Sequence, residues 1–252
     1  MARSSKGRTS WRGKKRFSGV FFSLFSFVAI CAAIIFGMSV FFEIENFEVT
    51  GAEKYTADQV VQVSQLKTGD NLFFFHKFAI TDRIKSEMPY VSEVTIRRKL
   101  PNTIAFEVVE TKAVAYFVSG GNGILIDESG KVLEKSPVLE HPNLAQIKNF
   151  EPKTAIVGEI FTVDDKISEK KLIELLKKLK EYDILKDISE IDLQNLYNVR
   201  MRYNERYTIV LGDMNDLERK MRLFTQVLPK IGDYVSASID LTGEKSAVVG
   251  AE

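Results

Sequence analysis

The hydrophobic positions of this chain fall into one long unbroken run, followed by many short periodic segments. The run extends from Phe17 to Phe42, 26 residues without a charged side chain, and consists mainly of Phe, Ile, Ala and Val. At about 1.5 Å per residue a helix over it would be roughly 39 Å long, which exceeds the ~30 Å hydrocarbon core of a membrane. The pattern therefore predicts a transmembrane helix over residues 20–42.

The charges on either side of the run predict its direction. Seven basic residues and no acidic residue precede it within the tail 1–19, whereas three glutamates follow it. The positive-inside rule then places the N-terminus in the cytoplasm and the remaining 210 residues outside. A cleaved signal peptide would have a shorter apolar stretch that ends at small residues. Ile30 stands where a lipoprotein site at Cys31 would need a small residue. We therefore expect an uncleaved anchor in the cell membrane.

Residues 43–112 alternate between strand and helix patterns in the order strand, helix, helix, strand, strand. The first helix is predicted by a capping box, in which Thr56 is followed three residues later by Gln59. The second helix ends before Pro89, and the last two strands form a hairpin that turns at Pro101. The residues expected to face inward are Val60, Val63 and Leu66 in the first helix and Phe78, Ile80, Ile84 and Met88 in the second.

Residues 113–252 are expected to form a second, mixed β-rich domain with two covering helices. One helix pattern, at 167–183, follows the pair Asp164–Asp165, which we interpret as its start signal. The other begins at Asn215 or Asp216, one of which should cap it. Both segments together predict an α+β fold. The strand patterns of the second domain lie at 114–118, 123–127, 131–135, 144–150, 188–194, 197–203 and 207–212, with two more pieces on either side of Gly243.

Composition excludes several classes of function. Cys31 is the only cysteine and lies in the apolar run, which leaves none outside it for a disulfide, a thiolate zinc site or a catalytic thiol. Neither His76 nor His141 has a recognisable ligand or triad spacing, and the hydrolase motifs G-x-S-x-G and H-E-x-x-H do not occur. We therefore expect no enzyme activity, no cofactor, no bound metal and no small-molecule substrate.

Two further patterns are explained by structure rather than by ligand binding. Gly120, Gly121 and Gly123 precede a strand pattern instead of the helix that a phosphate-binding loop requires, which favours a hairpin turn. The basic residues of the tail 1–19 are those that membrane topology requires, and they also suit anionic lipid headgroups. Because no nucleic-acid-binding module accompanies them, we expect no nucleic-acid partner.

Three stretches after the apolar run resemble the POTRA domain of the bacterial FtsQ and DivIB division proteins. They are IENFEVTGAEKYTADQV, GDNLFFF and PYVSEVTIRRKLPNTIAFEVVETKAVAYF. The last is the most specific, because this family joins a V-x-x-V-x-R-x-x-P-x-T-I hairpin to an E-x-x-P-V-A strand. Lys112 and Ala113 stand where the family has a basic residue and a proline. The resemblance continues, by pattern more than by motif, to the last residue.

This resemblance implies a non-enzymatic component of the divisome with a single membrane span, located at the division septum. It implies binding to FtsB (DivIC) and FtsL type proteins outside the membrane, which couples septal peptidoglycan synthesis to division. The implied mode is β-augmentation, in which a partner strand pairs with an exposed strand edge. The family's edge stretch, D-x-R-Y-x-S-G-x-A-V-G, aligns with residues 240–250. The implied partner-binding residues are Gly243, Lys245, Ser246, Ala247, Val248 and Val249, with Gly243 in place of a family aromatic residue.

Three alternatives stay open. The last strand is otherwise an ordinary closing edge of a sheet. Arg97, Arg98 and Lys99 in the POTRA hairpin either form a solvated hairpin end or dock to an acidic partner. The whole chain is alternatively a POTRA-containing export or assembly factor that binds client polypeptides, although no repeated domain or barrel pattern supports this. A cell-wall hydrolase is disfavoured by the missing catalytic groups.

Overall fold

The computed structural model describes residues 15–137, 143–231, 236–243 and 248–250, with side chains from Phe21 onward except those of Val248 and Val249. By their contacts the residues form two compact units. The first comprises residues 1–48, 66–76 and 97–105, and the second comprises 49–65, 77–96 and 106–252.

The N-terminal helix α1 (Lys15–Phe41) contains the predicted membrane span. It begins five residues before the predicted start at residue 20 and ends at Phe41. Its stretch Phe21–Phe41 is long and apolar enough to cross a membrane, and no other helix in the described part of the chain is. None of this stretch is buried within the protein. A helix that is apolar on every side and has no protein cover is suited to lipid rather than to water.

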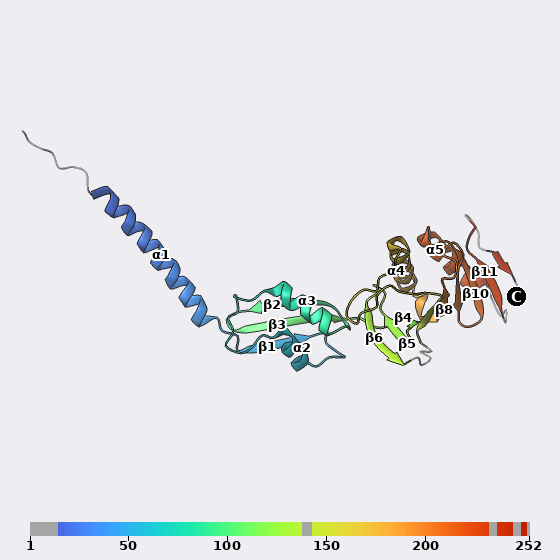
Figure 1. Cartoon of the computed structure of the whole chain (residues 1–252), viewed down its shortest axis with the longest axis horizontal. Coiled ribbons are helices and arrows are strands. Elements are labelled where there is room, and N and C mark those ends of the chain that lie inside the picture. The colour runs from blue at the N-terminus through green and yellow to red at the C-terminus, as the bar shows by residue number, and fades with distance from the viewer. Residues whose placement is uncertain (1–14, 138–142, 232–235, 244–247, 251–252) are drawn as a thin grey trace, which may run out of the picture. The chain divides into compact units, whose positions relative to one another are not determined.

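The next five elements follow the predicted order of strand, two helices and two strands. They are β1 (Asn46–Thr50), α2 (Ala57–Ser64), α3 (Lys77–Glu87), β2 (Val91–Lys99) and β3 (Thr103–Glu110), and the three strands form a sheet in the order β1-β3-β2 (Figure 1). The predicted capping box is confirmed. The Gln59 amide donates to Thr56 Oγ1 at 3.3 Å and the Thr56 amide donates to Gln59 Oε1 at 2.8 Å.

The prediction that Phe78 of α3 faces inward is wrong. Ile80, Ile84 and the following Met88 are buried, but the side chain of Phe78 is 86% exposed. Successive residues of a helix are about 100° apart, so residues 80, 84 and 88 form one row, whereas residue 78 lies about 160° away from residue 80. In α2, Val60 and the following Leu66 are buried as predicted, and Val63 is half-buried.

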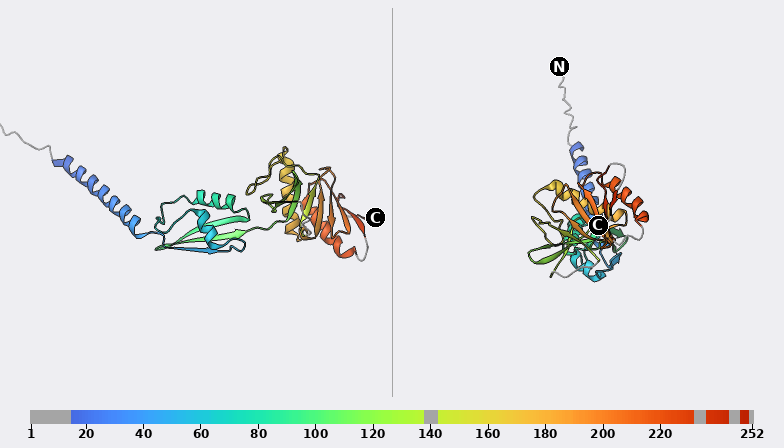
Figure 2. Two further views of the ribbon diagram at one scale, coloured as in Figure 1. Left: turned by 60° about the horizontal axis from the view of Figure 1, so that its bottom comes forward. Right: turned by 90° about the vertical axis from the view of Figure 1, so that its right-hand side faces the viewer.

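The second domain is built on one nine-stranded sheet, with strand order β12-β11-β10-β9-β8-β7-β4-β5-β6. Most neighbours are antiparallel, but β4 and β7, β7 and β8, and β10 and β11 pair in parallel. Figure 2 shows how the sheet twists from β6 toward β11. The elements are β4 (Ala115–Ser119), β5 (Asn122–Ile126), β6 (Val132–Pro137), β7 (Ala145–Lys148), α4 (Lys166–Glu181), η1 (Leu185–Asp187), β8 (Ile188–Asp192), β9 (Val199–Tyr203), β10 (Tyr207–Gly212), α5 (Leu217–Val227), η2 (Leu228–Lys230), β11 (Ala237–Asp240) and β12 (Val248–Gly250).

The turn between β4 and β5 confirms the interpretation of the glycines at 120 and 121. Ser119 pairs with Asn122, so the loop has two residues, Gly120 and Gly121, with φ of +58° and +77°. Positive φ at both central positions is the geometry that matches the twist of a two-residue hairpin, and glycine adopts it at the lowest cost.

The helices α4 and α5 pack side by side on the sheet, as predicted (Figure 1). Asp165 begins α4, since its carboxylate accepts the amides of Ile167 at 3.0 Å and Ser168 at 3.2 Å. The predicted cap of α5 is only partly right: Asp216 occupies the cap position, but at a φ of 50° its side chain makes no capping hydrogen bond. The buried helix residues are Leu172, Leu175, Leu176 and Leu179 of α4 and Leu217, Lys220, Met221 and Phe224 of α5.

We predict that Thr56→Ala lowers the free energy of unfolding by about 1 kcal/mol, because the first turn of α2 loses its capping hydroxyl. Urea unfolding of the part outside the membrane measures this. Thr68→Ala, at an exposed loop position, is the control and should change the free energy by less than about 0.5 kcal/mol. Equal effects of the two substitutions would show that the capping box contributes nothing.

Candidate partner-binding edge

The last strand, β12, lies at one end of the nine-stranded sheet. It pairs antiparallel with β11, with Asp240 opposite Val248, Ile239 opposite Val249 and Ser238 opposite Gly250. Within residues 15–137, 143–231, 236–243 and 248–250, no strand lies on the other side of β12. An end strand presents a row of backbone N–H and C=O groups to which another chain can add a strand.

The structure locates only some of the predicted partner-binding residues. Val248 and Val249 lie in β12, and Gly243 lies in the segment that leaves β11, where it is exposed. Lys245, Ser246 and Ala247 lie outside the described residues. Residues 248 and 249 therefore belong to an end strand of the sheet, and partner binding there stays a prediction.

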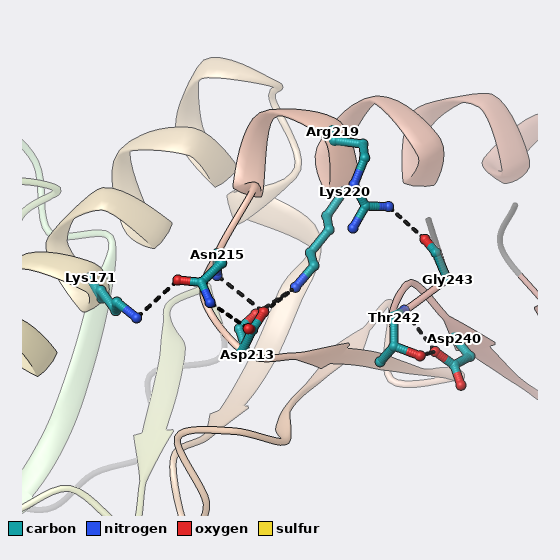
Figure 3. Close-up of polar contacts among 8 residues, drawn as sticks. All are labelled: Lys171, Asp213, Asn215, Arg219, Lys220, Asp240, Thr242 and Gly243. Carbon is teal, nitrogen blue, oxygen red and sulfur yellow. Dashed lines mark hydrogen bonds and ion pairs between the residues drawn. The ribbon is translucent and has the colours of Figure 1, made fainter. Parts of the chain in front are cut away.

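The segment between β11 and Gly243 is held by side chains on both sides (Figure 3). Asp240 Oδ1 accepts the Thr242 amide at 2.8 Å and the Thr242 hydroxyl at 2.6 Å. Both hydrogen bonds lower the pKa of Asp240, and the bond from the Thr242 hydroxyl has the larger effect. From α5, Arg219 Nη1 donates to the Gly243 carbonyl at 2.6 Å. The start of the connection to β12 is therefore fixed to a helix by one charged side chain.

A buried lysine anchors the same part of α5. The side chain of Lys220 is 4% exposed, and its Nζ donates to the Asp213 carbonyl and to Asp213 Oδ1, both at 2.7 Å. The hydrogen bond from Lys220 is the main cause that lowers the pKa of Asp213, with further bonds from Asn215. The Asn215 Oδ1 atom in turn accepts from Lys171 of α4 at 3.0 Å (Figure 3). This chain of contacts ties α4, α5 and the end of β10 together.

Gly212 permits the close approach of β10 to the segment after β11. Its φ is +73°, and a Cβ atom there would lie 2.8 Å from Cγ2 of Thr242. A side chain at this position would strain the backbone and displace Thr242. An open cleft of about 450 Å³ lies beside this approach and is lined by Tyr197, Gly212, Asp213, Asn215, Asp216, Arg219, Lys220 and Thr242.

The polar side chains of this cleft are used in hydrogen bonds and an ion pair. Its buried cation, Lys220, is neutralised by Asp213, and Asn215 and Thr242 are used in hydrogen bonds that fix the loops. Among the described residues, no group of three or more His, Cys, Asp or Glu side chains is placed to hold a metal ion.

The second predicted site, the basic cluster of the POTRA hairpin, is partly engaged within its own unit. Arg98 Nε donates to the Leu72 carbonyl at 2.6 Å, and its guanidinium lies 4.9 Å from the centre of the Phe75 ring. Lys99 pairs with Glu48, and Arg97 is exposed. Arg98 is therefore a residue that holds the 72–75 loop, a role that its place in a charge cluster did not reveal. Docking of a partner to these residues stays a prediction.

Sequence analysis also missed Lys131. This side chain is largely buried, and its Nζ donates to the Lys85 carbonyl at 2.8 Å and to the Val91 carbonyl at 2.9 Å. Burial lowers the pKa of Lys131, against the opposing effect of the Asp127 charge. The turn before β6 is thereby fixed to the end of α3 and the start of β2. A lysine after a D-x-x-G turn gives no sequence signal of burial, since lysine is usually exposed.

We predict that Asp213→Asn lowers the free energy of unfolding by about 1–2 kcal/mol, because the buried Lys220 ammonium loses its carboxylate partner. Asp216→Asn is the matched control, since Asp216 makes no capping bond and asparagine tolerates its positive φ. A lowered pKa means that the stabilising charge is present above the ordinary aspartate value and is lost as the pH falls. In urea unfolding, the difference between wild type and Asp213→Asn should therefore shrink below about pH 4. A difference that persists unchanged in acid would contradict this account.

Comparison with known proteins covers both domains. The family model for the POTRA domain of FtsQ type matches residues 42–111, and that for the C-terminal part of cell division protein FtsQ/DivIB matches residues 115–242. The second match covers half of the chain and ends before the β12 edge.

Individual relatives agree. Cell division protein DivIB of Clostridium acetobutylicum is 29% identical over 188 residues, which cover 75% of this chain and 74% of that protein. Cell division protein FtsQ of Corynebacterium glutamicum is 25% identical over 212 residues, 81% of this chain and 89% of that protein. The major extracytoplasmic domain of DivIB from Geobacillus stearothermophilus is 15% identical, and the alignment covers 47% of this chain and 91% of that domain with a TM-score of 0.33. On the sequence matches to both domains, the chain belongs to the FtsQ/DivIB family of bacterial cell division proteins.

Proposed function

We propose that this chain is a non-enzymatic, membrane-anchored divisome component that binds FtsB/DivIC and FtsL type proteins outside the membrane. Its role is to help couple septal peptidoglycan synthesis to cell division. In this proposal the tail 1–19 is cytoplasmic, residues 20–42 span the membrane once, and the POTRA domain (43–112) and β domain (113–252) lie outside, at the septum. The observation that carries the binding role is the open β12 edge in a member of this family.

The two ends of the sheet differ in a way that favours β12 as the binding edge. The strand at the other end, β6, exposes Glu134 and Lys135 and ends at Pro137. Charged residues and proline are features that protect an edge from pairing with another chain. The β12 sequence, VVG, has neither a charge nor a proline. A partner strand can therefore pair with the backbone of β12 more easily than with the backbone of β6.

Binding by β-augmentation is stronger when the edge strand is already ordered before the partner arrives. A preordered strand lowers the conformational entropy that binding costs. The contact from Arg219 to the Gly243 carbonyl and the turn at Asp240 and Thr242 supply this order at the start of the connection to β12. We therefore assign Arg219 as a positioning residue for the edge.

We predict that a proline in β12 weakens partner binding. The two variants are Val248→Pro and Val249→Pro, because neighbouring amides of a strand point to opposite sides and only one of the two faces away from β11. At least one variant should weaken binding by about tenfold or more, since proline removes a ladder donor and distorts the strand. The measurement is a titration of residues 43–252 with the extracytoplasmic segment of an FtsB/DivIC type protein, alone and together with FtsL.

The matched control is Lys135→Pro, in β6 at the opposite end of the sheet, which should bind as wild type does. Circular dichroism checks that every variant is folded. Binding that survives both β12 variants would reject this edge and move the site toward Arg97, Arg98 and Lys99. The absence of binding to either partner would instead favour the POTRA-containing export or assembly factor.

We predict that Arg219→Ala weakens the same binding by about threefold to tenfold, the effect of one charge-assisted hydrogen bond. Arg222→Ala, at an exposed position one turn further along α5, is the control and should bind as wild type does. Because Arg219 acts by ordering the edge, the loss of affinity should come mainly from a slower association rate. The β12 amides of the Arg219→Ala variant should also exchange their hydrogens faster than those of wild type. An equal loss in both variants would indicate a general effect of charge.

A further inference from the structure

The end of the first unit near α1 carries exposed apolar side chains outside the helix itself. Phe74, in the loop 71–76, is 63% exposed, and Leu100, in the turn between β2 and β3, is 64% exposed. Both segments belong to the same compact unit as α1. Large apolar side chains that cluster on an exposed surface often mark a site of contact with a partner or a membrane.

The loop 71–76 is attached to the last turns of α1. Asn71 Nδ2 donates to the Met38 carbonyl at 2.9 Å and to the Ser39 carbonyl at 3.3 Å. The Leu72 amide donates to the Phe42 carbonyl at 2.8 Å, and the rings of Phe42 and Phe73 meet edge to face at 5.2 Å. The loop therefore lies beside the end of the helix.

These contacts fix the level of the loop along the helix. The apolar stretch Phe21–Phe41 has 21 residues, and a helix of that length covers about 32 Å, close to the ~30 Å of the hydrocarbon core. Met38 is three residues before the end of this stretch, which corresponds to about 4.5 Å. When α1 spans the membrane, Asn71 and its neighbours lie at the boundary between the hydrocarbon core and the headgroups. Aromatic side chains are enriched at this depth.

The charges that share this end are compatible with a headgroup layer. Glu48 pairs with Lys99, and the Asp70 carboxylate accepts the Lys67 amide at 2.8 Å. On β2, Arg97 is exposed, while Arg98 and Lys99 are engaged with Leu72 and Glu48 of the same unit. Acidic groups that are already hydrogen-bonded oppose the approach of the membrane less than free ones do.

We propose that the loop 71–76, through Phe74, and the turn at Leu100 form a second contact with the membrane, in addition to α1. The partner is the lipid interface of the bilayer that α1 spans, so this inference rests on the proposed single-span topology. The contact holds the near end of the POTRA domain at the membrane surface and restricts its rotation about the point where the chain leaves α1.

The test places a single tryptophan at Phe74 of the full chain, reconstituted in vesicles of phosphatidylcholine and phosphatidylglycerol that contain dibrominated lipid. Trp11, the only natural tryptophan, is replaced by Trp11→Phe. We expect the fluorescence of Phe74→Trp to be quenched by brominated lipid and protected from acrylamide in the water. Tyr197→Trp, at an aromatic position 86% exposed in the β domain, is the matched control and should show the opposite behaviour. Phe36→Trp, within α1, reports on the span itself.

The outcomes separate this contact from the proposed topology. Quenching at both Phe36→Trp and Phe74→Trp, without quenching at Tyr197→Trp, supports the contact. Quenching at Phe36→Trp alone, with Phe74→Trp open to acrylamide, overturns the contact and leaves the span intact. Protection of Phe74→Trp from both quenchers overturns it in favour of a second copy of the chain. Absence of quenching at Phe36→Trp overturns both the span and the contact.

Discussion

Burial of one face of the nine-stranded sheet under α4 and α5 holds the second domain together. The leucines of α4 and the apolar side of α5 share one buried cluster with residues from β4 to β11. Because the only cysteine lies in α1, no disulfide supports this domain, and its stability depends on packing and hydrogen bonds. Every feature of the candidate edge is positioned by this layer: α5 presents Arg219 to the chain after β11 and Lys220 to the end of β10.

The nine-stranded sheet has two end strands, and their residues differ in charge and in proline content. At one end β6 has charged residues and a proline, and at the other β12 is short and apolar. The difference is consistent with selection for one open edge rather than with a general tolerance of exposed strands. An apolar edge is also a liability before a partner binds, because it can pair with other chains. Its short length, with three residues in the described strand, limits that risk.

The sequence predicted the features that depend on neighbouring residues. The capping box at Thr56 and Gln59, the glycine turn after Ser119 and the start of α4 at Asp165 are each set by residues close together in the chain. It did not predict the parallel insertion of β7 between β4 and β8, since register between distant strands leaves no local pattern. Phe78 shows the limit of approximate periodicity, because one residue out of row faces solvent. For the candidate edge, the family resemblance indicated the strand, but the Arg219 contact joins residues 24 positions apart and needed the structure.

The buried Lys131 has a consequence for what sequence comparison can reveal. Both of its acceptors, at residues 85 and 91, are main-chain carbonyls, so these hydrogen bonds do not require a particular side chain at either position. A contact of this kind is invisible to methods that infer proximity from co-varying residues, and a fixed junction between the POTRA hairpin region and the β domain would pass unnoticed in an alignment.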